Sequence, residues 1–319
     1  MTEPRPPRQH VDPATASPPD EPETGHDAEA ITTRQRTQLQ LITLRFLRHR
    51  AAMVSLFVFL LIVAFAFVGP YLWEWDHTVS RDIPSSQPPS WAHPFGTTSA
   101  GNDVFAQVMR GTQKSLQVAF TVGALTVVIG ALWGTIAGYY RGKIDAIMMR
   151  FVDVLLIIPL LVLVVALAGS TRGGTTWYVV ALIIGLFGWT TAARVVRGVV
   201  LSLREQEFVE ASKAMGASDA RIILTHLLPN AAGAIIVAGT LAIALAILAE
   251  AGLSFLGFGI QPPDTSLGLL VERARTAART RPWLFYPPGF MIVLIALTIN
   301  FIGDGLRDAL DPRQTMMRR

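Results

Sequence analysis

Long uncharged stretches fill most of this chain, and charged residues fall mainly between them. Six stretches lie between bounding charges: Ala51–Trp73, Ser115–Tyr140, Val154–Thr171, Gly173–Ala193, Ile222–Ala249 and Pro282–Gly303. A helix rises about 1.5 Å per residue, so about 20 residues cross a hydrocarbon core of about 30 Å. The stretches are too long for buried strands and too uniformly apolar for amphipathic soluble helices. The pattern predicts an all-α fold with six transmembrane helices.

Composition agrees with a membrane protein. Hydrophobic residues make up 51% of the chain and charged residues only 16%. A soluble fold has too little interior to cover that much apolar surface, so lipid must be the solvent for much of the chain. Cysteine is absent, which excludes a disulfide framework, a thiolate metal site and a cysteine nucleophile.

Residues 1–35 differ from the rest because they are rich in proline and acidic residues and nearly lack large apolar side chains. Ordering such a segment costs more entropy than its burial returns. The segment also lacks the basic start and apolar core of a signal peptide. We therefore predict a disordered cytoplasmic tail over 1–35 and a membrane domain over 36–319. A docking role for the tail is the alternative.

Basic residues set the expected orientation. Lysine and arginine are more abundant in the segments that share a side with the N-terminus, such as those near Arg45, Arg141 and Arg197. Basic loops stay in the cytoplasm, so both termini are expected to be cytoplasmic. Four arginines in the last external loop, between Arg273 and Arg281, weaken this pattern.

A polar internal loop at 194–229 carries the most specific pattern. Leu203–Met215 is predicted to be helical and to carry three acids, Glu205, Glu207 and Glu210. Gly216 then interrupts the helix, because glycine tolerates the dihedral angles of a sharp turn. The expected product is a rigid helix–turn–helix that projects into the cytoplasm.

The second half of this loop continues the pattern. Ser218 or Asp219 is expected to cap a second helix. Pro229, which lacks an N–H group, suits the entry to the next membrane helix.

This loop resembles the EAA loop of ABC-importer permeases, written E-A-A-x3-G-x9-I-x-L-P. The residues that match or conservatively replace it are Glu210, Ala211, Ser212, Gly216, Leu228 and Pro229. Ser212 stands for the second alanine, and His226 stands where the pattern has isoleucine. The resemblance implies a type I ABC-importer architecture, in which the short helix seats in a cleft of an ATPase subunit.

Further motifs narrow the resemblance to the dipeptide, oligopeptide and nickel permeases, and to the second, C-type subunit. They are His93–Thr97, Gly101–Val104, Glu250–Gly257, Gln261–Pro263 and Gly303–Pro312. The resemblance implies uptake of di- or oligopeptides through a multi-pass subunit of the bacterial cytoplasmic membrane. Nickel or another small solute remains the alternative cargo.

The same resemblance implies a set of partners. They are a B-type permease, two ABC ATPase subunits, an extracytoplasmic substrate-binding protein, the peptide and membrane lipid; nucleic acid is not expected. ATP and magnesium are expected on the ATPase subunits. Near Gly142 and Lys143 this chain fails the phosphate-loop pattern G-x4-G-K-[ST], because Ala137 and Ile144 occupy two required positions. No cofactor is therefore expected in this chain.

Catalytic and metal sites are not predicted. His93 and His226 lack neighbours at metal-ligand spacing, and the acids fall on opposite sides of the predicted membrane. We therefore predict a non-catalytic subunit. A secondary transporter is the alternative from another class, but it needs midplane ion sites and inverted repeats that the sequence does not display.

Glu250 is the clearest charge next to a membrane stretch, and such charges are functional candidates. Its position near the expected outer face favours structural hydrogen bonding, with contact to peptide at an outer gate as the alternative.

Packing devices are predicted as well. Gly123, Gly130, Gly134 and Gly138 permit close helix packing. Val104–Arg110 and Leu267–Arg279 are expected to lie as helices on the membrane surface.

Overall fold

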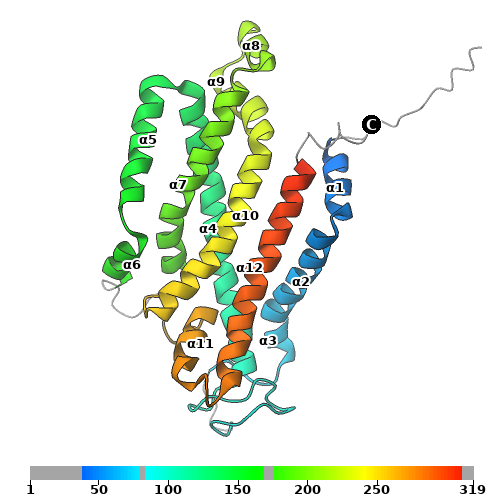
Figure 1. The fold of residues 1–319 in the computed structure, drawn as a ribbon, viewed down its shortest axis with the longest axis vertical. Helices are drawn as coiled ribbons and strands as arrows, with labels where there is room; N and C mark the ends of the chain where they lie inside the picture. The colour runs from blue at the N-terminus through cyan, green and yellow to red at the C-terminus, as the bar shows by residue number, and fades with distance from the viewer. Residues whose placement is uncertain (1–37, 79–82, 169–175, 311–319) are drawn as a thin grey trace, which may run out of the picture. The chain divides into compact units, whose positions relative to one another are not determined.

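The computed structural model describes residues 38–78, 83–168 and 176–310, and the predicted tail over 1–35 lies outside them. This part of the chain is helical, with one isolated β-bridge between Thr97 and Asp103. Five helical runs in it are long and apolar enough to cross a membrane: α2 (Arg50–Phe67), α4 (Val104–Tyr140), α7 (Trp177–Leu203), the continuous run Asp219–Phe255 and α12 (Pro282–Leu310). They lie side by side in Figure 1.

The continuous run Asp219–Phe255 consists of α9 (Asp219–Arg221), a π-helical turn at Ile222–Leu227 and α10 (Leu228–Phe255). Shorter elements lie before or between the long runs: α1 (Gln38–Arg48), α3 (Gly69–Leu72), α8 (Glu207–Ala214), α11 (Leu267–Ala274) and a 3₁₀ turn at Arg275–Ala277. Helices α8 and α9 lie at one end of the bundle, and α3 and α11 lie at the other (Figure 1).

The third predicted membrane helix is interrupted. In place of one helix over Val154–Thr171, the structure has α5 (Gly142–Ile157) and α6 (Leu160–Ala168). Ile158 between them is extended, with φ −74° and ψ 117°. Pro159 explains the break, since proline disfavours helical angles at the residue before it and donates no hydrogen bond. The prediction of an uninterrupted helix is therefore wrong, and residues 169–171 lie outside the described chain.

The two predicted surface helices behave differently. Val104–Arg110 is not a separate helix but forms the first turns of α4, where the Asp103 carboxylate accepts a hydrogen bond from the Ala106 N–H at 2.7 Å. Leu267–Ala274 does form a helix, α11, but most of its apolar residues are buried against the bundle rather than facing lipid. An amphipathic pattern alone does not separate a lipid surface from a protein surface.

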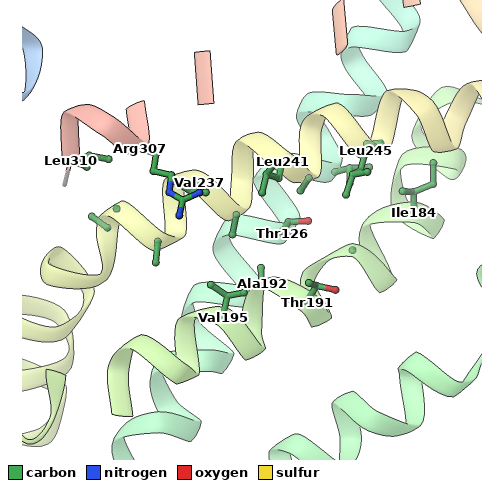
Figure 2. Close-up of a pocket in the computed structure, with 18 of the residues that line it drawn as sticks. Thr126, Ile184, Thr191, Ala192, Val195, Val237, Leu241, Leu245, Arg307 and Leu310 are labelled. Atoms are coloured by element: carbon green, nitrogen blue, oxygen red, sulfur yellow. The ribbon is translucent and has the colours of Figure 1, made fainter. Parts of the chain in front are cut away.

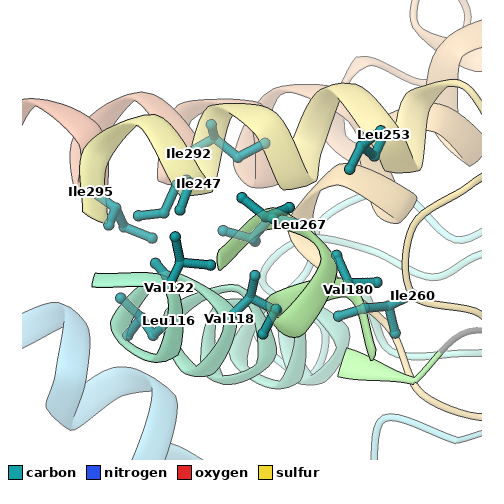
Figure 3. Close-up of a cluster of buried hydrophobic side chains, with 14 of the residues drawn as sticks. Leu116, Val118, Val122, Val180, Ile247, Leu253, Ile260, Leu267, Ile292 and Ile295 are labelled. Carbon is teal, nitrogen blue, oxygen red and sulfur yellow. The ribbon is translucent and has the colours of Figure 1, made fainter. Parts of the chain in front are cut away.

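The main apolar cluster lies where α4, α7, α10, α11 and α12 meet (Figure 3). Leu116 of α4, Ile247 of α10 and Ile295 of α12 are buried in it. Lipid chains are as apolar as these side chains, so helix association inside a membrane depends on van der Waals contact and hydrogen bonds. Close fit therefore matters more here than total apolar area.

Glycines bring α4 against α7. A Cβ on Gly130 would lie 2.8 Å from the Ala192 Cβ, and one on Gly138 would lie 3.0 Å from the Arg197 carbonyl oxygen. A Cβ on Gly134 would lie 2.9 Å from the Arg197 nitrogen. Real Cβ atoms rarely approach this closely, so the three glycines allow contact between the two backbones. The predicted close packing is confirmed.

Two ion pairs hold α5 to α7. Arg197 contacts both carboxylate oxygens of Asp145 at 2.5 Å, and Arg194 contacts Asp153 at 2.5 Å. Paired arginine and carboxylate groups satisfy each other's hydrogen bonds with a defined geometry. The two pairs fix the angular position of α5, whose apolar side chains remain largely exposed.

At the α11 end, one carboxylate receives two cations. Asp264 accepts from Arg110 at 2.9 Å and from Lys114 at 3.0 Å, which ties the segment before α11 to the start of α4. Burial alone would raise the pKa of Asp264, but the hydrogen bonds from Lys114 and Arg110 outweigh it and lower that pKa.

The glycine contact predicts opposite effects for two Gly→Ala changes. Alanine at Gly198, which has no neighbour within 4 Å of its added Cβ, should be neutral or slightly stabilising because alanine favours helices. Alanine at Gly134 should destabilise by about 1–3 kcal/mol, because the new Cβ overpacks against α7. Thermal unfolding of the purified protein in detergent measures both, and equal melting temperatures would contradict the proposed packing.

The Asp264 cluster predicts a pH-dependent stability difference. The folded pKa is lowered, so the ionised carboxylate stabilises the fold at neutral pH and loses that effect as the pH falls through the folded value. Asp264→Asn should therefore lower the melting temperature at pH 7, with the gap to wild type narrowing in acid. Thermal melts across the acid range test this, and a gap independent of pH would show that the charge contributes nothing.

Candidate functional site

The segment between α7 and α10 forms a hairpin, which we define as residues Glu207–Arg221 and call the α8–α9 hairpin. Its turn is at Gly216, whose φ is +80°. The Gly216 N–H donates to the Lys213 carbonyl at 2.9 Å, and the Ala217 N–H donates to the Ser212 carbonyl at 3.0 Å. This pair of bonds is the Schellman motif that ends helices at a left-handed glycine. The predicted glycine turn is therefore present.

The helix before the turn is shorter than Leu203–Met215. α7 continues to Leu203, the chain then turns, and α8 begins at Glu207. Glu205 consequently lies in the turn and pairs with Arg141 at 2.7 Å, so its predicted place on the helix is wrong. The sequence did not reveal this because an acid with an ion-pair partner suits a turn as well as a helix.

Helix α8 has one buried side and one exposed side. Val209 and Ser212 are buried, and the Ser212 hydroxyl donates to the Phe208 carbonyl at 2.7 Å. Glu207 and Glu210 are exposed in the first turn, where the helix dipole favours negative charge. The same helix therefore seats on the bundle and presents acids outward; Ala211 is also exposed.

The second half of the hairpin leads directly into α10. Ser218 is the N-cap of α9 by its backbone angles, but its side chain makes no capping bond. Asp219 instead accepts a hydrogen bond from the Tyr139 hydroxyl at 2.6 Å. Leu228 and Pro229 are the first two residues of α10, and the helical run already begins at Asp219.

The π-helical turn accommodates this proline. The Leu228 N–H donates five residues back, to the Ile223 carbonyl. The Asn230 side-chain amide donates to the His226 carbonyl at 2.6 Å. A wide turn and a side-chain donor can thus satisfy carbonyls beside a residue that lacks an N–H group.

A cavity of about 1190 Å³ lies beside the hairpin's exit, between α4, α7 and α10, with the end of α12 and parts of α1 and α6 at its edge. In Figure 2, Thr126, Ala192 and Val237 lie around it on three different helices. Most lining residues are apolar; the charged ones among those described are Arg45 and Arg307. Sequence patterns could not identify this lining, because lipid-facing and cavity-facing apolar residues look alike.

Glu250 lies outside the cavity lining and is fully buried. Its carboxylate accepts from the Ser115 hydroxyl at 3.0 Å and from the Ser254 hydroxyl at 2.7 Å. The Ser115 hydroxyl also accepts from the Leu267 N–H at 3.3 Å, and Ser254 contacts Ser266 at 3.2 Å. This network joins α4, α10 and the start of α11, so it supports the expected structural hydrogen bonding.

Two family models match separate parts of this chain. Residues 130–316 match the family described as binding-protein-dependent transport system inner membrane component. Residues 37–89 match the N-terminal transmembrane domain of oligopeptide transport permease C. The two matches therefore lie in the N-terminal and the C-terminal part of the membrane domain.

Curated relatives match over nearly their full lengths. The oligopeptide transport system permease protein OppC of Mycobacterium tuberculosis (strain ATCC 25618 / H37Rv) is 42% identical over 279 residues, 88% of this chain and 96% of the relative. OppC of Bacillus subtilis (strain 168) is 38% identical over 288 residues, 90% and 93% of the two chains. The dipeptide transport system permease protein DppC of the same organism is 40% identical over 294 residues, 91% of each chain.

Solved structures share the fold at lower identity. Two inward-facing crystal forms of the MetNI methionine ABC transporter align with TM-scores of 0.52 and 0.54 at 23% and 22% identity. Each covers 64% of this chain and 96% of the other. The architecture is thus all-α and of the type I ABC-importer permease kind. With a family match over 130–316 and relatives near 40% identity, this chain belongs to the binding-protein-dependent transport system inner membrane components, the permease subunits of ABC importers.

Proposed function

We propose that this chain is one of two permease subunits in a bacterial ABC importer that takes up di- or oligopeptides. The matching relatives are named for oligopeptide and dipeptide transport, and they align over about 90% of this chain. The B-type permease is the expected second subunit, and a substrate-binding protein delivers the peptide from outside. Nickel is the alternative cargo, because the family resemblance alone does not separate the two.

The cavity is the proposed contribution of this chain to the pathway. Its volume of about 1190 Å³ exceeds the range of about 300–1,000 Å³ usual for drug-sized ligands. Its lining is mostly alanine, glycine, valine and leucine, which offers no fixed hydrogen-bond pattern to a particular side chain. Such a surface suits peptides, whose side chains vary. The second permease would close the open side.

The α8–α9 hairpin supports a role for this chain in coupling ATP hydrolysis to transport. It projects from one end of the bundle (Figure 1), its turn is closed by its own backbone, and Glu207 and Glu210 face outward. We propose that this hairpin seats in a cleft of an ATPase subunit, which binds ATP and magnesium. Closure of the two ATPases would then change the direction in which the cavity opens.

The orientation follows from the same proposal. The hairpin must lie in the cytoplasm to reach the ATPases, and the basic residues also favour cytoplasmic termini. A reporter fused after Arg319 should therefore read as cytoplasmic, and one inserted near residue 85 should read as external. The reverse readings would exclude the proposed contact with ATPases.

The hairpin itself is tested by substitutions at Gly216. Valine there should strain the turn, because φ is +80° although space for a Cβ is free. Asparagine tolerates that angle better and should retain function. In a reconstituted complex, Gly216→Val should lower peptide uptake and peptide-stimulated ATP hydrolysis by about 5- to 30-fold, the factor that corresponds to a strain of about 1–2 kcal/mol. Gly216→Asn should stay within about twofold of wild type.

Charge reversal complements this test. Glu210→Lys should weaken ATPase binding without disturbing the bundle, because Glu210 is exposed on α8. Glu29→Lys, in the N-terminal tail, is the matched control and should transport normally. Normal peptide uptake by both Gly216→Val and Glu210→Lys would show that the hairpin does not couple ATP hydrolysis to transport. Uptake of Ni²⁺ in place of labelled peptide by the wild-type complex would select the alternative cargo.

A further inference from the structure

Tyr139, in the last turn of α4, lies directly beneath the α8–α9 hairpin and is only 5% exposed. Its hydroxyl donates a hydrogen bond to Asp219 at 2.6 Å. Asp219 is the first residue of α9, on the far side of the Gly216 turn. One side chain of a membrane helix therefore holds the outgoing arm of the hairpin.

The same tyrosine also contacts the incoming arm. The Lys213 ammonium, in the last turn of α8, lies 5.3 Å from the centre of the Tyr139 ring. The Arg204 guanidinium, at the end of α7, lies 5.9 Å from that centre and also donates to the Tyr139 carbonyl oxygen. Cations at these distances are attracted by the electron-rich face of an aromatic ring. Tyr139 thus contacts the end of α7, α8 and α9 together.

Apolar packing surrounds the ring independently of its hydroxyl group. Tyr139 belongs to a buried cluster with Val200 of α7, Val209 of α8 and Ile222 of the π-helical turn. Removing the hydroxyl alone should leave this cluster in place. Phenylalanine at this position therefore separates the hydrogen bond to Asp219 from the packing.

Helix α4 continues from Tyr139 to the other sites. Thr126 and Val122, on the same helix, line the cavity, and Ser115 beyond them donates to Glu250. The glycines that contact α7 make α4 and α7 a closely packed pair, so a displacement at one end of α4 is carried along both helices.

We propose that Tyr139 is a positioning residue that fixes the α8–α9 hairpin to α4 and so carries movement of the hairpin to the cavity. This inference rests on the proposed coupling function of the hairpin. It adds a specific contact that the EAA-type motif does not contain, because Tyr139 lies at the end of α4, and α5, α6 and α7 separate it from that motif along the chain. Asp219 and Lys213 are its partners on the two arms.

The test uses Tyr139→Phe in the complete reconstituted complex, with Tyr71→Phe as a matched control because Tyr71 is 88% exposed on α3. Tyr139→Phe should lower the number of peptides transported per ATP hydrolysed about fivefold, the factor expected for loss of one hydrogen bond. Basal ATP hydrolysis and assembly of the complex should be unchanged. Tyr71→Phe should behave as wild type.

A second measurement reports position directly. The chain has no cysteine, so spin labels can be placed at Met215→Cys, 80% exposed, and Val128→Cys on α4, 57% exposed. The distance distribution between them should broaden in Tyr139→Phe and remain narrow in Tyr71→Phe. Asp219→Ala should broaden it similarly, and the double variant should add little, since both changes remove the same bond.

The outcomes separate the two proposals. If Gly216→Val abolishes coupling while Tyr139→Phe and Asp219→Ala match wild type in coupling and in label distance, the positioning role is wrong and the hairpin function stands. If Gly216→Val also transports normally, both proposals fall. If Tyr139→Phe reduces assembly of the complex, Asp219→Ala tests the positioning role instead, because Asp219 is exposed and lies outside the apolar cluster. Normal coupling in Asp219→Ala would overturn the inference.

Discussion

Contact between the backbones of α4 and α7 is the constraint on which the rest of the structure depends. In lipid, the hydrophobic effect does not drive two apolar helices together, so van der Waals contact between closely fitting surfaces must supply the attraction. The glycines at 130, 134 and 138 allow this fit, and they place one end of α4 under the hairpin and its middle beside the cavity. A membrane crossing that packs this closely acts as a single rigid element.

Polar groups then fix the ends of that element. Glu250 joins α4 to α10 and α11, Asp264 ties the start of α4 to the segment before α11, and Tyr139 joins the other end to the hairpin. Each group has named partners, and fully buried Glu250 in particular needs them in its low-dielectric environment. Because hydrogen bonds are directional, these anchors define helix positions that apolar contact alone would leave free to slide.

Much of the fold was predictable because membrane crossing imposes a length and a composition on each helix. The Gly216 turn was also predictable, since few residues tolerate its backbone angle. The break at Pro159 was missed because the membrane helices were predicted from the absence of charge, which takes no account of the effect of a proline on the backbone of its neighbour Ile158. The cavity and Tyr139 were missed for another reason: their roles arise from residues that are distant along the chain, and no local pattern records such pairs.

The Schellman bonds at Gly216 have a consequence for how importers diversify. The hairpin keeps its shape through its own main-chain bonds and through contacts on its inner side, among them the hydrogen bond between Tyr139 and Asp219. Its outer residues can therefore change by mutation without refolding the turn. Under the proposed contact with an ATPase subunit, the same backbone turn can present different outer side chains to different ATPases, so recognition between subunits can evolve separately from the packing of the bundle.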